Sequence, residues 1–473
     1  MSTQSAPETT YLDGAVTVQD GRVTVVDEAA LATERMDALV RQAVFGEAAG
    51  REYARWVLWE TGQAVGVRPA SIHDLYVARG RGEISGFTVP AINVRAATYD
   101  TARSIFRTAI KMDAGAFIFE IARSEIAYTD QRPAEYVAVL IAAALREGFR
   151  GPLFIQGDHF QVNAKKFAVD SKTEVAAVTQ LATEAVHAGF YNVDVDTSTL
   201  VELNMGSLDE QQRRNYETAV EITRFVRGLE PKGVTISVGG EIGEVGTENS
   251  TPEELEAFMK GFNQVLAESA PGMEGLSKIS VQSGTSHGGT VLPDGSIADV
   301  ALDIDTLRTL GEIARRDYGM AGAVQHGAST LPDAQFNAFP KAETAEIHLA
   351  TNFQNMMFDH LPDDLRREVY AWLAENAKDE RKATDTEEQF IYKTRKKAIG
   401  SFKRRLWDLD AATKQALADA YDAKFGFLFT QLAVGGTRKH VERYVNAIRL
   451  HRQMPVDGKP AVEAAPDDAD LSD

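Results

Sequence analysis

Residues 87–122 read FTVPAINVRAATYDTARSIFRTAIKMDAGAFIFEIA and set the pattern for the middle of this chain. The stretch begins with a short apolar run (87–94), continues with apolar residues at helical spacing (97–113) and closes with a second apolar run (115–122). Short runs rich in β-branched and aromatic residues predict buried strands, and the spacing between them predicts an amphipathic helix. The stretch therefore predicts a strand–helix–strand unit.

The same unit recurs as far as residue 351. Apolar runs of this type predict strands at residues 87–94, 115–122, 152–158, 191–198, 233–243, 278–284, 321–327 and 345–351. The segments between them predict helices at residues 97–113, 133–147, 172–188, 208–229, 252–269 and 303–318. Strands and helices that alternate in this way are typical of an α/β protein with a (β/α)₈ TIM barrel. An open doubly wound sheet is the alternative, but it usually carries a Gly-rich phosphate turn after its first strand, where this chain has AINVRAATYD.

The segments on either side of the barrel have a different character. Residues 1–71 predict an N-terminal extension that is partly helical, because apolar residues recur at helical spacing over residues 28–62. We assign the barrel to residues 72–358 and a helical C-terminal region to residues 359–455. Helices are predicted in that region at residues 371–376, 387–412 and 414–433. Residues 456–473 form an acidic tail that we expect to be disordered.

Composition excludes several classes of function. The 473 residues contain 50 Lys plus Arg against 69 Asp plus Glu, and the net charge of −19 disfavours binding to nucleic acid or anionic lipid. No apolar stretch approaches the roughly 20 residues of a membrane span, and the first residues lack a basic segment followed by an apolar one, so we expect a cytoplasmic protein. The chain has no cysteine, which excludes disulfides, thiolate nucleophiles and Cys-ligated zinc.

Three of the nine histidines stand where predicted strands end: His159, His287 and His326. In a barrel the carboxyl ends of all strands converge on one mouth, so these imidazoles would share a single cavity. Any one of them alone would be interpreted as a hydrogen-bonded histidine near a strand end. Three together predict a metal site, because neutral imidazole is the commonest transition-metal ligand and three histidines with an open position form a known catalytic zinc arrangement.

Carboxylates are predicted at the same rim. Asp158 directly precedes His159, where a carboxylate beside a metal could move protons, and Glu241 ends the fifth predicted strand. Asp196 is interpreted either as a second metal ligand or as a structural residue that caps a turn. The segment 244–251, EVGTENST, has the small and polar composition of a mobile lid that would carry Glu248, and a solvated loop is the alternative.

Two further patterns suit an anionic substrate. The turns GTSHGGT and HGAST follow the sixth and seventh predicted strands, where barrels often bind phosphate through backbone N–H groups, although glycine also serves ordinary turns. The one basic run, KTRKKAIGSFKRR at residues 393–405, is either a solvated helix or a segment from which Arg395 reaches an anionic end of a substrate.

Taken in order, these motifs resemble those of the class II, metal-dependent fructose-bisphosphate aldolases. That family opens its barrel with a phrase like VPAFNV, and residues 89–94 here read VPAINV. Its other motifs resemble, in turn, the Asp158–His159 pair, DTS at residues 196–198, EIG at 241–243, GTSHG at 284–288, HGAS at 326–329 and HLATNFQ at 348–354. The likeness covers roughly residues 72–358 in consistent order, so the chain is identified as a longer, divergent member of this family.

The resemblance implies a catalytic Zn²⁺, or another divalent transition metal, on His159, His287 and His326, with Glu241 as an alternative ligand. The ion would polarise the ketone of a phosphorylated sugar and stabilise the enediolate. Asp158 would exchange the hydroxyl proton, and Glu248 would take the carbon-bound proton. The substrate and its phosphates would contact Asn93, Gly288, Gly327, Ser329, Thr351 and, at the far end, Arg395 of the same or a neighbouring subunit. A metal-free aldolase would need a strand-borne lysine, and Lys278, the only lysine in a predicted strand, lies at the wrong end.

The departures from the family pattern concern the substrate. His348 stands where the family usually has Asn, and Thr330 replaces a glycine of the phosphate loop. We expect reversible aldol cleavage of a small-molecule sugar phosphate, by default fructose 1,6-bisphosphate to dihydroxyacetone phosphate and glyceraldehyde 3-phosphate, by a homo-oligomer (dimer or tetramer) with no nucleic-acid or membrane partner. The alternatives are a different ketose phosphate, or a non-catalytic stabilising subunit of a tagatose-bisphosphate-type aldolase.

Overall fold

A computed structural model describes Leu12 and residues 14–243, 248–284, 292–293, 302–455 and 464–465. Eight parallel strands form a closed barrel, because β6 pairs with both β5 and β7 and because β11 pairs with β4. In barrel order the strands are β4 (Val89–Asn93), β5 (Ile118–Ala122), β6 (Gly151–Gln161), β7 (Asn192–Asp196), β8 (Ser237–Glu241), β9 (Lys278–Ser280), β10 (Ala323–Gln325) and β11 (Glu346–Leu349). The predicted (β/α)₈ barrel is confirmed, and the closed ring excludes the open sheet.

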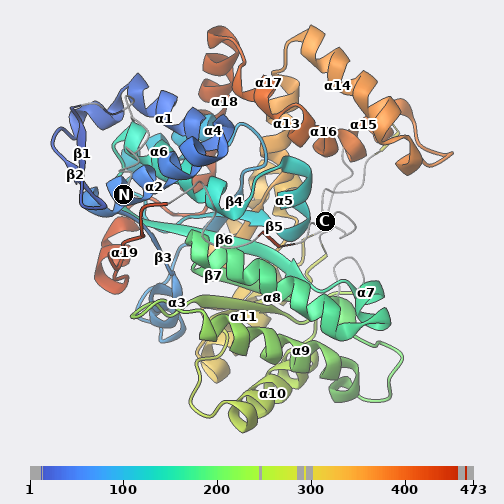
Figure 1. The fold of residues 1–473 in the computed structure, drawn as a ribbon. Coiled ribbons are helices and arrows are strands. Elements are labelled where there is room, and N and C mark those ends of the chain that lie inside the picture. Colours follow the sequence, from blue (N-terminus) through green and yellow to red (C-terminus); the bar gives the residue numbers. More distant parts are fainter. Residues whose placement is uncertain are drawn as a thin grey trace.

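Helices that follow the strands cover the outside of the barrel (Figure 1). They include α4 (Thr98–Lys111), α6 (Pro133–Glu147), α8 (Ser171–Ala188), α9 (Leu208–Gly228), α10 (Pro252–Ser269) and α11 (Ile304–Tyr318). Short helices also occupy the loops after β5 and β6, namely α5 (Arg123–Thr129) and α7 (Ala164–Val169). Local signals set several boundaries: Thr251 and Glu254 form a capping box at the start of α10, and Pro occupies the first turn of both α6 and α10.

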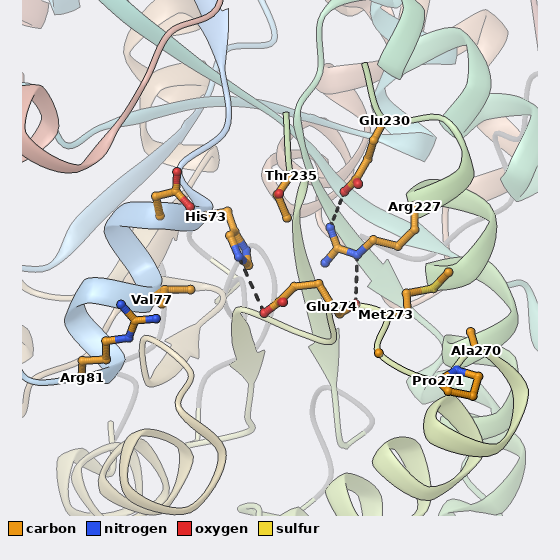
Figure 2. A pocket seen from close by; sticks show the side chains of 12 residues that line it. His73, Val77, Arg81, Arg227, Glu230, Thr235, Ala270, Pro271, Met273 and Glu274 are labelled. Atoms are coloured by element: carbon orange, nitrogen blue, oxygen red, sulfur yellow. Dashed lines mark hydrogen bonds and ion pairs between the residues drawn. The ribbon is translucent and has the colours of Figure 1, made fainter. Parts of the chain in front are cut away.

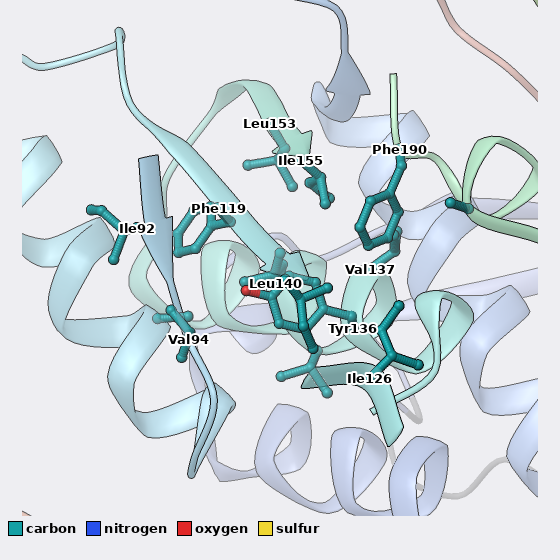
Figure 3. Packing of buried hydrophobic residues seen from close by; sticks show 14 of the residues in the cluster. Ile92, Val94, Phe119, Ile126, Tyr136, Val137, Leu140, Leu153, Ile155 and Phe190 are labelled. Carbon is teal, nitrogen blue, oxygen red and sulfur yellow. The ribbon is translucent and has the colours of Figure 1, made fainter. Parts of the chain in front are cut away.

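The main hydrophobic core lies between the strands and the outer helices. Figure 3 shows Phe119 and Ile155 of the barrel wall facing Tyr136 and Leu140 of α6. Helix α6 is apolar around most of its surface because α1 (Glu34–Phe45) and α2 (Ala48–Val65) pack over its outer side. The N-terminal extension is therefore part of the barrel core and shields a helix that would otherwise expose apolar residues to water.

Three short strands in the N-terminal extension were not predicted. β1 (Val16–Gln19) and β2 (Arg22–Val25) form an antiparallel hairpin, and β3 (Val67–Ala70) pairs in parallel with the first residues of β6. Strand β3 reads VRPA, which is too short and polar to show the apolar run of a strand. It forms because β6 is long enough to pair with β3 at its start and with β7 farther along.

One predicted helix of the C-terminal region is wrong as a single element. The segment 387–412 is divided into α15 (Glu387–Thr394), α16 (Ala398–Ser401) and α17 (Lys403–Trp407). The division follows from docking against α5, because a Cβ at Gly400 would lie 2.7 Å from the carbonyl oxygen of Tyr128. The remaining C-terminal helices are α13 (Thr351–Asp359), α14 (Asp363–Asn376), α18 (Ala411–Gln431) and α19 (Arg438–Tyr444).

The two extensions meet on one side of the barrel. Trp407 of α17 packs edge-on against Phe45 of α1, with ring centroids 5.3 Å apart, and Arg41 of α1 pairs with Asp408 at 2.6 Å. No helix among the residues described above is long and apolar enough to cross a bilayer. Most of the predicted acidic tail, 456–473, lies outside the described residues.

Candidate active site

A bulge in β6 places Asp158 and His159 at the mouth of the barrel. Gly157 of β6 pairs with Val193 of β7, but the next pair joins Phe160 to Val195, so β6 contains one extra residue between them. His159 adopts a φ of +40°, a backbone conformation that is uncommon for non-glycine residues. The strand predicted at residues 152–158 continues in the structure to Gln161, and the bulge within it sets the two side chains at the mouth.

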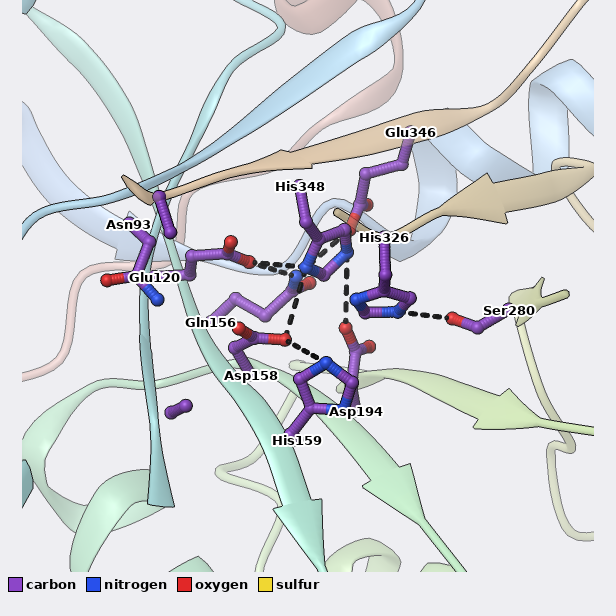
Figure 4. Close-up of polar contacts among 12 residues, drawn as sticks. Asn93, Glu120, Gln156, Asp158, His159, Asp194, Ser280, His326, Glu346 and His348 are labelled. Carbon is purple, nitrogen blue, oxygen red and sulfur yellow. Dashed lines mark hydrogen bonds and ion pairs between the residues drawn. The ribbon is translucent and has the colours of Figure 1, made fainter. Parts of the chain in front are cut away.

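Two of the predicted histidines lie side by side. The ring centroids of His159 and His326 are 4.3 Å apart (Figure 4). His159 Nδ1 lies 3.2 Å from Asp196 Oδ2 and 3.6 Å from Glu241 Oε2. The ligand atoms of His159, Glu241 and His326 all lie within 4.8 Å of one another. Imidazole and carboxylate donors at this spacing fit a divalent transition metal. The predicted third imidazole, His287, lies outside the described residues, as do Gly288 and the start of the predicted lid.

The electrostatics of this cluster suit a cation. Burial acts to lower the pKa of His159, but Asp158 and its other carboxylate neighbours raise it well above the ordinary value. Burial and Asp196 raise the pKa of Glu241, whereas Asp196 itself has a lowered pKa because its bonds to His159 outweigh burial. The groups thus hold a proton among them, and a divalent cation can take the place of that proton.

Second-sphere contacts orient the two imidazoles. His326 Nε2 lies 2.9 Å from the hydroxyl of Ser280 on the neighbouring strand, and Asp196 Oδ2 accepts a 2.6 Å hydrogen bond from the amide of Gln161. Asp196 Oδ1 also accepts from the Ser198 hydroxyl. Asp196 therefore holds His159 rather than standing apart as a separate site, and such partners fix the orientation of metal-binding histidines.

A second polar layer lies below this cluster inside the barrel. The ring of His348 of β11 lies tilted against that of His326, with centroids 4.0 Å apart, and pairs with carboxylates on both ring nitrogens, among them Asp158 at 3.1 Å and Glu346 at 2.8 Å. Glu346 in turn pairs with the ammonium group of Lys278 at 2.5 Å, and that group also lies 2.9 Å from Asp194. The barrel interior is therefore filled by charged side chains that neutralise one another.

Lys278 is unsuited to Schiff-base chemistry. Its side chain is 1% exposed and its ammonium group is enclosed by Asp194, Glu346 and the amide oxygen of Gln156. Burial acts to lower its pKa, but Asp194 and Glu346 raise it, so the amine stays protonated. An amine must lose its proton to attack a carbonyl, which favours metal-assisted chemistry at this site.

The predicted phosphate-binding residues on β10 and β11 lie together. Gly327 has a φ of +70° and begins a short 3₁₀ turn, and the Ser329 hydroxyl within that turn accepts a hydrogen bond from the backbone N–H of Ala350. Thr351 follows directly as the first residue of α13. Asn93 is buried at the end of β4, where its amide donates to Glu125 Oε2 at 2.6 Å.

Two predicted site residues have other surroundings. Glu248 is exposed, and in the described part of the chain no ion pair or hydrogen bond joins it to the histidine cluster. Arg395 is buried against α13, where it donates to the side chain of Asn355 and its guanidinium lies over the rings of Phe358 and Tyr392. In this conformation Arg395 contacts the back of α13 and not the histidines.

The buried polar residues that the sequence analysis did not assign to the site share one signal. They are polar side chains two positions before a rim residue on the same strand, so they point into the barrel: Gln156 before Asp158, Asp194 before Asp196, Lys278 before Ser280 and Glu346 before His348. A search for polar residues of period two in apolar strands could have found these four. It would not have found Glu120 of β5, a further buried carboxylate whose pKa burial and the neighbouring Asp158 raise to about 8.

Comparison with known families agrees with this geometry. The family model described as Fructose-bisphosphate aldolase class-II matches residues 81–405. The chain belongs to the class-II fructose-bisphosphate aldolase family. Membership supports an aldolase, a carbon–carbon lyase, of a family whose members are typically metal-dependent. No curated protein sequence matches the chain.

Solved structures related to this aldolase family member are distant in sequence. A probable tagatose 6 phosphate kinase from Sinorhizobium meliloti 1021 has 17% identity and a TM-score of 0.50, over 76% of this chain and 99% of that one. The fructose-bisphosphate aldolase from Campylobacter jejuni has 15% identity and a TM-score of 0.45, over 76% of this chain and 93% of that one. At these identities the first likeness shows the barrel fold alone.

Proposed function

We propose that this protein is a Zn²⁺-dependent aldolase that reversibly cleaves a phosphorylated ketose, by default fructose 1,6-bisphosphate to dihydroxyacetone phosphate and glyceraldehyde 3-phosphate. The observation that carries the proposal is the position of Asp158. The β6 bulge sets its carboxylate next to His159, whose ligand atom lies within 4.8 Å of those of His326 and Glu241. A proton-transfer group beside a set of metal donors is the arrangement that aldol cleavage requires.

The site residues would have three roles: metal binding, proton transfer and phosphate binding. His159, His326 and Glu241, with His287 as a predicted further ligand, would hold the ion, which supplies Lewis-acid polarisation of a ketone when bound. Asp158 would exchange the proton of the hydroxyl whose carbon becomes the aldehyde, and Glu248 would take the carbon-bound proton. The turn that contains Gly327 and Ser329, with Thr351 at the start of α13, would bind one phosphate together with Gly288.

The remaining assignments follow from the same proposal. Asn93 would contact the substrate at the end of β4, and Arg395 would support the far phosphate end through its contacts with α13. The acidic net charge of −19 supports a small-molecule substrate, with no nucleic-acid or membrane partner. We propose a cytoplasmic homo-oligomer, a dimer or a tetramer.

One experiment tests the proposal. Bound metal is measured on the purified chain, together with release of dihydroxyacetone phosphate from fructose 1,6-bisphosphate, with and without a chelator. We expect about one zinc per chain, cleavage that the chelator abolishes and added Zn²⁺ restores, and loss of both metal and cleavage in His326→Ala. Metal without cleavage would point to another ketose phosphate. The absence of both bound metal and cleavage would contradict the proposal and favour a non-catalytic subunit.

A further inference from the structure

His348 is enclosed by acidic groups from three strands. Its Nδ1 lies 3.0 Å from Glu120 Oε2 and 3.1 Å from Asp158 Oδ1, and its Nε2 lies 2.8 Å from Glu346 Oε1. The ring is 5% exposed. The ring thus has a hydrogen bond at Nδ1 and an ion-pair contact at Nε2, and rotation of the ring would break one of them.

The carboxylate of Glu346, which faces Nε2 of His348, is itself held by hydrogen bonds from buried side chains. Glu346 Oε1 accepts from Lys278 and, at 3.0 Å, from the amide of Gln156, while its Oε2 accepts from the hydroxyl of Tyr76. All of these side chains are fully buried in the barrel interior. Glu346 is therefore held in place beside His348, as Figure 4 shows.

The opposite side of the ring faces the candidate active site. Asp158 Oδ1 accepts from His348 Nδ1 and also lies 3.7 Å from His159 Nε2. Asp158 lies within the bulge of β6, directly before His159 with its φ of +40°. A donor that reaches it from the barrel axis restricts its rotamer.

The distances also permit a different role for His348. The ligand atoms of Asp158, His326 and His348 lie within 4.8 Å of one another, a spacing compatible with a metal. His348 Nδ1, however, is hydrogen-bonded to Asp158, and Nε2 forms an ion pair with Glu346. These contacts favour a role in which His348 holds Asp158 in place.

We propose that His348 is a positioning residue that holds the carboxylate of Asp158 in place for proton transfer, through a buried chain of hydrogen bonds and ion pairs from Lys278 through Glu346. The inference rests on the proposed function, in which Asp158 exchanges the hydroxyl proton. It predicts that the two proton transfers of the reaction respond differently to a change at His348. Cleavage needs Asp158, whereas exchange of the carbon-bound proton of dihydroxyacetone phosphate is assigned to Glu248.

The test compares His348→Asn and His348→Gln with the wild-type protein loaded with zinc. Metal content, kcat and KM for fructose 1,6-bisphosphate, and solvent deuterium exchange into dihydroxyacetone phosphate by NMR are measured for each. In His348→Gln, whose amide nitrogen takes the place of Nε2 and leaves Asp158 without its donor, we expect unchanged metal content, a kcat lower by about 100-fold, and KM and exchange within about 3-fold of wild type. His348→Asn, whose amide nitrogen takes the place of Nδ1 and can still donate to Asp158, should recover part of the lost kcat.

The matched control is His73→Gln. His73 is also a buried histidine, but it lies in the pocket at the opposite end of the barrel, where the segments before β4, β8 and β9 meet (Figure 2). This variant should keep wild-type cleavage and exchange. Equal losses of cleavage and exchange in His348→Gln, a loss of metal, or a wild-type kcat would each contradict the positioning role.

A structural measurement separates this inference from the proposed function. If the wild-type protein cleaves no ketose phosphate, the proposed function fails, and the crystal structure of the zinc-loaded His348→Gln protein still decides the positioning role. We expect the Asp158 carboxylate to move away from its wild-type position in that structure. An unchanged Asp158 rotamer would overturn the inference whatever the activity.

Discussion

His73 and His348 are both buried histidines, and their neighbours give them opposite charge states. Burial and the nearby Arg227 lower the pKa of His73 to about 4, so it is neutral at pH 7. Burial acts in the same direction on His348, but Glu120 and Asp158 raise its pKa well above the ordinary value. Residue type alone therefore does not determine protonation; the charges within a few ångströms do.

The lowered pKa of His73 predicts a pH-dependent loss of stability. The unfolded chain protonates this histidine at about pH 6.5 and the folded chain only near pH 4, so the unfolded state binds more protons between these values. The free energy of unfolding should therefore fall as the pH drops below about 6.5, and the His73 contribution should reach about 2 kcal/mol by pH 5. Urea unfolding at pH 8, 6 and 5 measures this fall in the free energy of unfolding.

His73→Gln isolates this contribution, because glutamine does not titrate. The wild-type protein should lose about 2 kcal/mol more than the variant between pH 8 and pH 5. A difference in stability between the two proteins that stays constant over this range would show that His73 is not kept neutral by its surroundings.

At the scale of strands, the barrel interior depends on small residues opposite large charged ones. Gly239 of β8 pairs with Asp194 of β7, and a Cβ at Gly239 would lie 2.3 Å from Asp194 Oδ1 and 2.8 Å from the Cε of Lys278. The glycine therefore makes room for the ion pair that supports Glu346. The strands were predictable from their apolar runs, but this complementarity was not, because it joins three strands far apart in the sequence.

We expect Gly239→Ala to destabilise the protein by about 1–3 kcal/mol, since the added methyl group must displace Asp194 or Lys278 in a packed interior. Chemical denaturation with urea measures the effect. Gly228→Ala is the matched control: Gly228 ends α9, and a Cβ there meets nothing within 4 Å. That control should leave the stability unchanged or slightly raised. Equal effects of the two substitutions would show that the interior tolerates the methyl group.

At the scale of the whole molecule, residues close to the C-terminus complete the N-terminal extension. The segment 445–455 lies along α2, where the indole N–H groups of Trp56 and Trp59 donate to the backbone oxygens of Arg452 and Leu450. Glu60, buried between the two elements, accepts from the backbone N–H of Arg452 at 2.7 Å and pairs with His451 at 2.6 Å. The two ends of the chain therefore unfold together with α2 and the core beneath it.

Glu60→Ala should release the C-terminal segment, because it leaves the buried N–H of Arg452 without its acceptor and removes the ion pair with His451. We expect a loss of about 2–3 kcal/mol in the free energy of unfolding and faster proteolysis within residues 445–455. Tryptophan fluorescence and limited proteolysis measure these effects. Glu217→Ala, at an exposed position of α9, is the control and should change neither. Wild-type resistance to proteolysis in Glu60→Ala would contradict this account.

The sequence by itself determined the barrel and part of its mouth. Alternation of apolar runs with amphipathic segments requires each element to bury one face, and eight repeats leave a closed ring of strands as the favoured arrangement. Because parallel strands end at one rim, His159, His326, Asp158 and Glu241 were expected to converge, and the structure brings them together. These predictions needed only local pattern and topology.

The tertiary structure alone decided how the site is supported. The bulge in β6 depends on strand register. Two further features depend on side chains that meet across the barrel axis: the contact between the rings of His348 and His326, and the buried chain from Lys278 through Glu346 and His348 to Asp158. Such contacts join residues up to 190 positions apart, so no local pattern contains them. Closure of the sheet creates them, because it forces the inward side chains of all eight strands into one small volume that charged groups can occupy only in pairs.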